Sequence, residues 1–417
     1  MKKYSKLMTS SALVVGAMMI SSGLAQAREL VWLSARPENG AIVQTVRELA
    51  DAYAADHPDF SLDIQVTADR ASYLTKLRTL IASGEVPDFF DTDADPFARQ
   101  LADAGLMVDM AAFLDEEGLT DRFYEPAIRY QQFSDGSLYL LPLEYHLEMT
   151  WYNKAMFEKY GLSVPETLDD MLALNTSLSE DGVTPIAISG TDAWPMLRYL
   201  AMVPFRDTGN DFIRNLADGD LDTEMATKAA DFFQAVSQGF QPGFISTDYV
   251  TARNMFINGE AAMYRMGTWE LATFSNDALP EAMKNNVGYF YLPTTPDAVT
   301  PDNEFFGNSG IGMAAFSGSF DDEAKDFLSY LLENYSDIYV AKKQLSPLKF
   351  ELKDGVTYDP LFVEIKHDAD NYGEEFAKPW DTLLSPDANR VINDVAFRLA
   401  TGQISSEAFV SELGRLK

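Results

Sequence analysis

The sequence contains no cysteine, which excludes disulfide bonds, thiolate metal ligands and a catalytic thiol. Its three histidines, His57, His146 and His367, are far apart, so the sequence predicts no histidine-rich metal cluster. Basic residues are half as frequent as acidic ones, 32 against 64, and the formal net charge is −32. Nucleic acid and anionic lipid are therefore excluded as partners, because both bind cationic surfaces. We predict that no metal and no cofactor is needed.

Long hydrophobic runs are also missing. The apolar stretch Leu13–Ile20 is much shorter than the roughly 20 residues of a membrane-spanning helix. It follows three lysines and precedes the small-x-small sequence Ala25-Gln26-Ala27, an order typical of an export signal, here residues 1–27. A membrane anchor is the alternative. Because no cysteine is present for lipid attachment, we expect a periplasmic protein without stable membrane insertion.

With 417 residues, the chain is longer than a domain with a single hydrophobic core usually is, and its length suits two lobes. After the leader, strand-like and helical patterns alternate. We expect strands at 28–33, 60–66 and 89–90, with amphipathic helices at 42–53 and 73–82 between them. This alternation is typical of an α/β sheet that is mainly parallel and covered by helices.

Two loops follow strands of this sheet, 34–40 and 91–97, and ligands bind beyond the carboxyl ends of such strands. The first loop carries Arg36 and Glu38, and the second carries Asp93 and Asp95. These side chains are candidate ligand contacts. An exposed turn for the first pair, and turn or helix-capping roles for the second, are the alternatives.

The segment Leu138–Thr167, in the middle of the chain, combines an extended part with two expected helices. Its first part is extended and interleaves aromatic with polar residues, including Glu144, Tyr145 and His146. The pattern becomes helical after Asn153, and Thr167 is a candidate N-cap for a second helix. His146 is a candidate contact, with a buried structural histidine as the alternative. Glu144 or Glu148 could replace it as the polar group.

Further along, we expect strands at 183–189 and 287–293, a helix at 226–238 and an irregular exposed excursion at 205–222. Segment 256–269 predicts a helix end, a strand and a glycine turn that presents Trp269. Elsewhere, the candidate ligand contacts are Trp194, Tyr264, Asn308, Ser309 and the adjacent pair Trp380 and Asp381. Core packing is the alternative for the tryptophans.

Fourteen ordered positions in the central run carry a family resemblance. They are Gly136, Tyr139, Pro142, Tyr152, Asn153, Lys154, Phe157, Lys159, Tyr160, Gly161, Leu162, Val164, Pro165 and Thr167. With segments 76–88 and 256–269, they make the chain resemble extracellular solute-binding protein family 1, the sugar receptors of ATP-driven importers. The resemblance implies a two-lobed type II periplasmic-binding-protein fold. Each lobe would hold a mixed, mainly parallel sheet covered by helices, and the ligand cleft would lie between the lobes.

The resemblance also implies crossings near Leu143, Phe306 and Ser336. Lobe I would comprise residues 28–143 and about 307–336, and lobe II residues 144–306 and about 337–417. Trp269 occupies the position of the family's stacking tryptophan, and His146 the position of a ligand-binding acid in one relative.

Sugars present hydroxyl groups at the ring edge and C–H groups on each face, so receptors use aromatic plates and planar polar groups. Together with these candidate residues, the resemblance implies a monomeric binding protein that captures a di- or oligosaccharide or glycoside by hinge closure and delivers it to the permease of an ABC importer. A non-sugar solute is one alternative. An exported glycan-active hydrolase is another, although no nucleophile elbow or metal motif is present.

Overall fold

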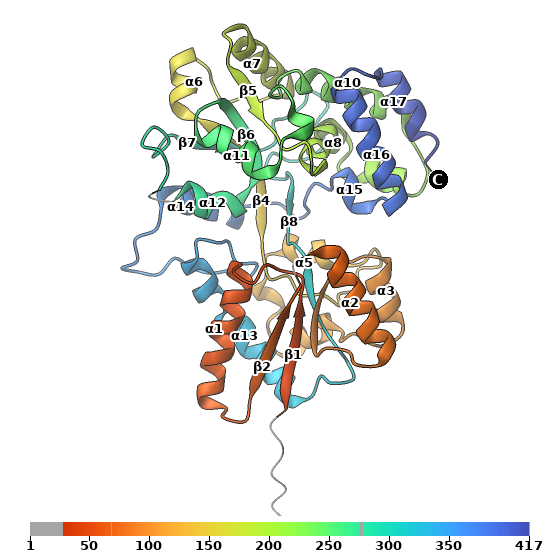
Figure 1. Cartoon of the computed structure of the whole chain (residues 1–417), viewed down its shortest axis with the longest axis vertical. Helices are drawn as coiled ribbons and strands as arrows, with labels where there is room; N and C mark the ends of the chain where they lie inside the picture. Colours follow the sequence, from red (N-terminus) through yellow and green to blue (C-terminus); the bar gives the residue numbers. More distant parts are fainter. Residues whose placement is uncertain (1–27, 68, 276–277, 417) are drawn as a thin grey trace, which may run out of the picture.

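The computed structural model describes residues 28–67, 69–275 and 278–416. The expected export signal, residues 1–27, lies outside this part. The protein has two lobes, one above the other in Figure 1, with β4 and β8 at the junction between them. Lobe I is the group of elements around a four-stranded sheet, and lobe II is the group around a five-stranded sheet.

Lobe I has the strand order β2-β1-β3-β9. Strand β1 (Glu29–Ser34) pairs in parallel with β2 (Ser61–Val66) and with β3 (Phe89–Thr92), as the alternating sequence pattern predicted. Strand β9 (Gly312–Ala315) returns from much later in the chain and pairs antiparallel to β3. The carboxyl ends of β1 and β3 therefore lie side by side.

The helices of lobe I cover both faces of this sheet. They are α1 (Ala41–Asp56), α2 (Arg70–Ser83), α3 (Pro96–Asp103), α4 (Met110–Glu116), the 3-10 helix η1 (Thr120–Arg122), α5 (Glu125–Gln131) and α13 (Asp322–Ala341). Neighbouring residues of β1 point into different cores, Trp32 into the one with α1 and α13, and Leu33 into the one with α2 and α3. Ser336 lies inside α13, whereas a crossing was expected near it. The lobe boundaries remain a prediction.

Lobe II has the strand order β5-β6-β4-β7, with β8 paired to the start of β4. Its strands are β4 (His146–Asn153), β5 (Thr184–Ala187), β6 (Ala261–Gly267), β7 (Val287–Phe290) and β8 (Gly307–Asn308). Among the described strands of this lobe, β5 and β6 pair in parallel, and β4 is antiparallel to β6, β7 and β8. The mixed α/β architecture is confirmed, but a mainly parallel sheet is found in lobe I alone. Strand periodicity is the same for both pairings, so the sequence pattern did not distinguish them.

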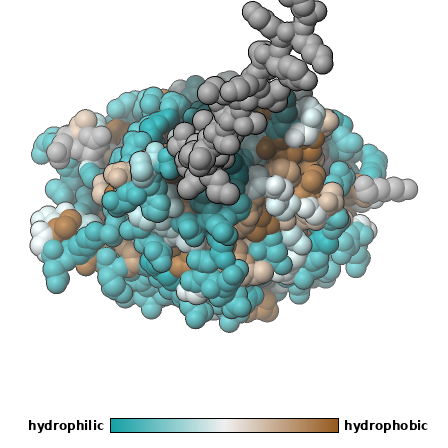
Figure 2. Space-filling model, turned by 90° about the horizontal axis from the view of Figure 1, so that it is seen from below, coloured by the Kyte–Doolittle hydropathy of each residue, from teal (hydrophilic) through white to brown (hydrophobic). Residues whose placement is uncertain are grey.

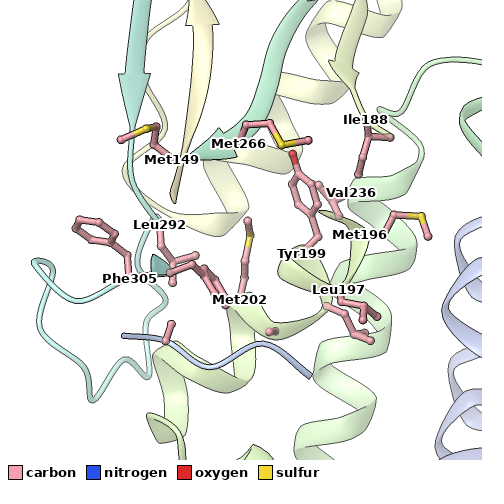
Figure 3. Close-up of a cluster of buried hydrophobic side chains, with 14 of the residues drawn as sticks. Met149, Ile188, Met196, Leu197, Tyr199, Met202, Val236, Met266, Leu292 and Phe305 are labelled. Atoms are coloured by element: carbon pink, nitrogen blue, oxygen red, sulfur yellow. The ribbon is translucent and has the colours of Figure 1, made fainter. Parts of the chain in front are cut away.

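Helices surround the sheet of lobe II. They are α6 (Lys154–Tyr160), α7 (Leu168–Glu180), α8 (Trp194–Thr208), α9 (Asp211–Ala217), α10 (Thr223–Ser237), the 3-10 helices η2 (Phe244–Ser246) and η3 (Thr268–Glu270), α11 (Tyr249–Ile257), α12 (Leu271–Phe274), α14 (Pro360–Asp370), α15 (Trp380–Leu383), α16 (Pro386–Ala400) and α17 (Ser406–Leu413). Figure 3 shows part of the core, where α8 contributes Met196, Tyr199 and Met202. Thr167 and Asp170 form the capping box that starts α7.

The expected irregular excursion at 205–222 is wrong. Helix α8 runs through Phe205 to Thr208, α9 follows almost at once, and Phe205, Phe212 and Leu216 are buried. Pro204 lies inside α8, although a proline interrupts the helical hydrogen-bond ladder. Tertiary packing outweighs that local cost here.

The surface agrees with the acidic composition. Figure 2 looks at the molecule from the lobe I end, and hydrophilic residues cover most of the visible face, with smaller hydrophobic patches. Every helix in the described ranges is too short or too polar to cross a bilayer.

Candidate functional site

Predicted site residues from both lobes meet at the junction. Lobe I contributes the end of β1 and β3, the connecting segment contributes Glu144, and lobe II contributes the start of β4, the turn after β6 and the start of α8. These side chains form three hydrogen-bonded or ion-paired groups and one pair of tryptophans.

On the lobe I side, Asp91 in β3 is completely buried and holds Arg36. The Trp32 indole N–H donates to its carboxylate at 3.1 Å, the Ser34 hydroxyl donates at 2.9 Å and the Ala35 backbone N–H at 2.8 Å. Arg36 Nη1 forms an ion pair with Asp91 Oδ1 at 2.6 Å. The parallel pairing of β1 and β3 thus fixes the position of one guanidinium group.

A chain of polar contacts continues from Arg36 across the junction. Arg36 Nη2 lies 3.7 Å from Glu144 Oε1, and Glu144 Oε2 lies 2.8 Å from His146 Nε2. His146 Nδ1 lies 3.3 Å from the hydroxyl oxygen of Thr268. Burial acts to raise the pKa of Glu144, but His146 and the charge of Arg36 outweigh it and hold that pKa below its ordinary value. The two lobes are therefore linked through side chains at their connection.

Two tryptophans lie on the lobe II side. The ring centroids of Trp194 and Trp269 are 5.9 Å apart, with an interplanar angle of 69°. The imidazole of His146 meets Trp269 edge-on at 5.3 Å. A Cβ on Gly267 would lie 2.2 Å from the Trp269 ring, so only glycine permits this ring position. Both indoles are partly buried.

A buried ion pair lies beside the tryptophans. Glu148 Oε2 accepts from Arg198 Nε at 2.9 Å, and Glu148 Oε1 accepts from Arg198 Nη2 at 3.1 Å and from Asn308 Nδ2 at 3.3 Å. The Arg198 guanidinium also covers the Trp194 ring, 4.9 Å from its centroid. Burial would raise the pKa of Glu148, but the charges of Arg198 and Arg265 and these hydrogen bonds lower it. Glu148 is therefore ionised at neutral pH.

The structure brings six of the predicted contacts together: Arg36, Glu144, His146, Trp194, Trp269 and Asn308. Asp93 lies nearby. It is exposed, pairs with Arg70, and its carboxylate is close enough to interact with the charge of Arg36. Its ion-pair partner is Arg70, so its contact with a ligand stays a prediction.

Other predicted contacts have different partners. Glu38 is exposed and pairs with Arg47 at 2.6 Å. Asp95 accepts from the Ala98 N–H at 2.9 Å and so caps α3, which was its alternative role.

Four further candidates are buried. Ser309 donates to the Ala127 carbonyl, Tyr264 donates to Glu270, and Tyr145 stacks on Tyr124 with centroids 4.8 Å apart. Trp380 is 1% exposed and packs against Phe212 and Phe409. Each of these side chains is therefore engaged with a partner in the interior of the protein. The side chain of Asp381 lies outside the described part.

Sequence reasoning missed Asp91, Arg198 and Thr268 as members of this site. Arg198 carried a usable signal, because it follows Trp194 by four residues on α8 and so shares its face. Asp91 lies within a buried strand, FFDT, where an acid needs partners from elsewhere in the chain. Among the described residues, no group of three or more His, Cys, Asp or Glu side chains could hold a metal ion.

The comparison with known proteins agrees with this geometry. Residues 39–334 match the bacterial extracellular solute-binding proteins over well more than half of the chain. The chain belongs to this family. The family's members and the relatives below are binding proteins.

Two relatives and one solved structure illustrate the similarity of this solute-binding protein. It is 26% identical to a probable sugar-binding periplasmic protein of Mesorhizobium japonicum, over 56% of each chain. It is 22% identical to the melibiose/raffinose/stachyose-binding protein of Bacillus subtilis, over 89% of this chain and 85% of the relative. A structure from work on xylan utilization by the thermophilic bacterium Caldanaerobius polysaccharolyticus superposes with a TM-score of 0.77 at 25% identity, covering 93% of this chain and 99% of the other. The chain spans about half the length of several curated relatives.

Proposed function

We propose that this solute-binding protein captures a di- or oligosaccharide or a glycoside at the junction of its lobes and delivers it to an ABC importer. The observation that carries the proposal is the pair of inclined indoles, Trp194 and Trp269, directly beside the buried Glu148–Arg198 ion pair. Indole faces suit the C–H faces of sugar rings, and fixed planar charged groups suit the hydroxyl edges. The names of two relatives also specify sugars.

Ligand capture works by hinge closure. A sugar that contacts both the lobe II tryptophans and Arg36 of lobe I favours the closed form by contacts that the open form lacks. The chain Arg36–Glu144–His146 lies at the pivot of this motion. The permease subunits of the importer then recognise the closed form, and the protein acts as a monomer in the periplasm.

A calorimetric titration with a panel of di- and oligosaccharides and glycosides tests this function. We expect at least one glycoside to bind, and Trp269→Ala to weaken that binding by about 30-fold or more, the loss of roughly 2 kcal/mol expected for a central aromatic contact. Glu38→Gln is the matched control, because Glu38 is exposed and pairs with Arg47, and its affinity should equal that of the unmodified protein. The proposal fails if every glycoside is inert while a peptide, polyamine or other non-sugar solute binds tightly.

A hydrolase is the second candidate, because Glu144 and Glu148 are two carboxylates at the same site. Glu144 is hydrogen-bonded to His146 and lies 3.7 Å from Arg36, and Glu148 forms an ion pair with Arg198. Their pKa values are lowered, whereas a general acid needs a raised pKa. We therefore propose that the protein has no enzymatic activity. Recovering the bound sugar intact after long incubation supports this, and a shortened product contradicts it.

A further inference from the structure

Arg265 on β6 is a buried cation without a hydrogen-bond acceptor. Its side chain is 3% exposed, and Nε, Nη1 and Nη2 have no partner among the described residues. Aromatic rings cover the guanidinium, with the Phe306 centroid 5.1 Å and the Tyr199 centroid 6.0 Å from its central carbon. A guanidinium group stays charged at neutral pH and carries only donors, so these nitrogens require an acceptor that the described residues do not supply.

Two more unpartnered polar atoms come from the elements that pack on Arg265. Thr150 on β4 is its cross-strand partner, and the Thr150 hydroxyl oxygen is buried without a hydrogen bond. Cross-strand partners share one face of the sheet with Cβ atoms about 5 Å apart. The Tyr199 hydroxyl of α8 is likewise fully buried and unpartnered. Three nitrogens and two hydroxyl groups from three elements are therefore left without partners in one region of lobe II.

The nearest carboxylate does not fill this role. Glu148 interacts with the charge of Arg265, but its oxygens accept hydrogen bonds from Arg198 and Asn308 and none from Arg265. Burial lowers the pKa of Arg265, because a charged group in this region has lost its hydration.

Another buried arginine of the same lobe shows how such a cation is normally satisfied. Arg206 is fully buried, and its N–H groups donate to the backbone carbonyls of Leu292, Pro293, Pro301 and Glu304. Arg265 has no such set of carbonyls. The difference indicates that a group other than the described residues provides the acceptor for Arg265.

We propose that a small inorganic anion of the halide class, such as chloride, binds inside lobe II to the guanidinium of Arg265 and to the hydroxyl groups of Thr150 and Tyr199. A halide accepts from every donor, and the two hydroxyl groups can rotate to donate to it. A water molecule accepts two hydrogen bonds and must also donate two, which suits a donor-rich region less well. The Phe306 and Tyr199 rings lie within 6.0 Å of the guanidinium carbon, which favours a small occupant.

Bromide replacement locates the anion directly. Crystals of the full chain grown in sodium bromide are expected to give an anomalous difference peak within hydrogen-bonding distance of the Arg265 guanidinium. Thr150→Val and Tyr199→Phe should each lower the height of the peak, because each removes one donor. Electron density for water alone, without anomalous signal at this position, overturns the proposal.

Thermal unfolding gives a second readout, which does not depend on any sugar. Replacing sodium gluconate by sodium chloride at equal ionic strength is expected to raise Tm by roughly 2–4 °C. Arg265→Met should abolish this response, and Arg206→Lys is the matched control that should keep it. If Arg265→Met does not fold, the Thr150→Val/Tyr199→Phe double variant replaces it and should show a reduced response. An equal chloride response in the unmodified protein and in these variants overturns the proposal.

Discussion

Replacing Glu148 by glutamine removes one buried negative charge with almost no change in volume. Glu148 is 2% exposed and accepts two hydrogen bonds from Arg198 and one from Asn308. Removing one partner of a buried ion pair costs about 3–5 kcal/mol, because the other charge stays buried without compensation. Glutamine keeps one acceptor oxygen, so we expect the free energy of unfolding to fall by about 3 kcal/mol, near the lower end of this range. For lobes of this size the loss corresponds to a Tm lower by roughly 6–12 °C.

Urea unfolding followed by tryptophan fluorescence measures this loss. The matched variants are Arg198→Met and the double variant Glu148→Gln/Arg198→Met. Because the two side chains interact directly, the double variant should lose less stability than the sum of the single losses. A loss below about 1 kcal/mol for Glu148→Gln, or strictly additive losses, would refute the reasoning that this pair is buried and coupled.

The same variant predicts a pH dependence. Interaction with Arg198 and Arg265 lowers the pKa of Glu148 in the folded protein, against the opposing effect of burial. A lowered folded-state pKa contributes stability above the unfolded value, about 4.3, and that contribution is lost as pH falls through the folded-state pKa. The stability difference between the unmodified protein and Glu148→Gln should therefore be constant near neutral pH and shrink in acid. A difference that grows on acidification contradicts this sign.

Three further predictions concern single positions. Trp380→Ala should lower the free energy of unfolding by about 3–5 kcal/mol and leave the affinity of the folded protein for its ligand unchanged, because the ring is in the core of lobe II. Urea unfolding and titration of the same sample check both parts, and lost affinity in a fully folded sample contradicts the assignment. Thr167→Ala should lower the free energy of unfolding by about 1 kcal/mol, since it removes the hydroxyl that caps α7. An unchanged unfolding midpoint would contradict a stabilising role of this cap. Gly310→Ala should lower the free energy of unfolding by about 1–2 kcal/mol, because φ is +62° there. It should also change the ligand affinity, because the new Cβ would displace Glu144. An affinity equal to that of the unmodified protein would show that Glu144 does not contribute to ligand binding.

The elements that depend on local sequence were predictable. Lobe I shows this best, where alternating strand and helix patterns gave β1, α1, β2, α2 and β3 in parallel pairing. The start of α7 was also readable, because a capping residue acts within one turn. Such signals need no knowledge of where the rest of the chain lies.

Contacts between distant residues were less accessible. Asp91 and Arg36 are 55 positions apart, and Glu148 and Arg198 are 50 apart, so no local pattern links them. Trp380 looked like an aromatic plate because an acid follows it in sequence, yet burial depends on the helices that come to cover it. The direction of a strand relative to its neighbours in lobe II was hidden for the same reason.

A crystal structure of the protein saturated with the tightest-binding glycoside tests the central claim most directly. We predict one sugar ring against the face of Trp269 or Trp194, hydroxyl groups within hydrogen-bonding distance of Arg36 or Glu144, and lobes closer together than in the structure described above. A sugar bound elsewhere on the surface, with neither indole against a sugar ring, would contradict the account.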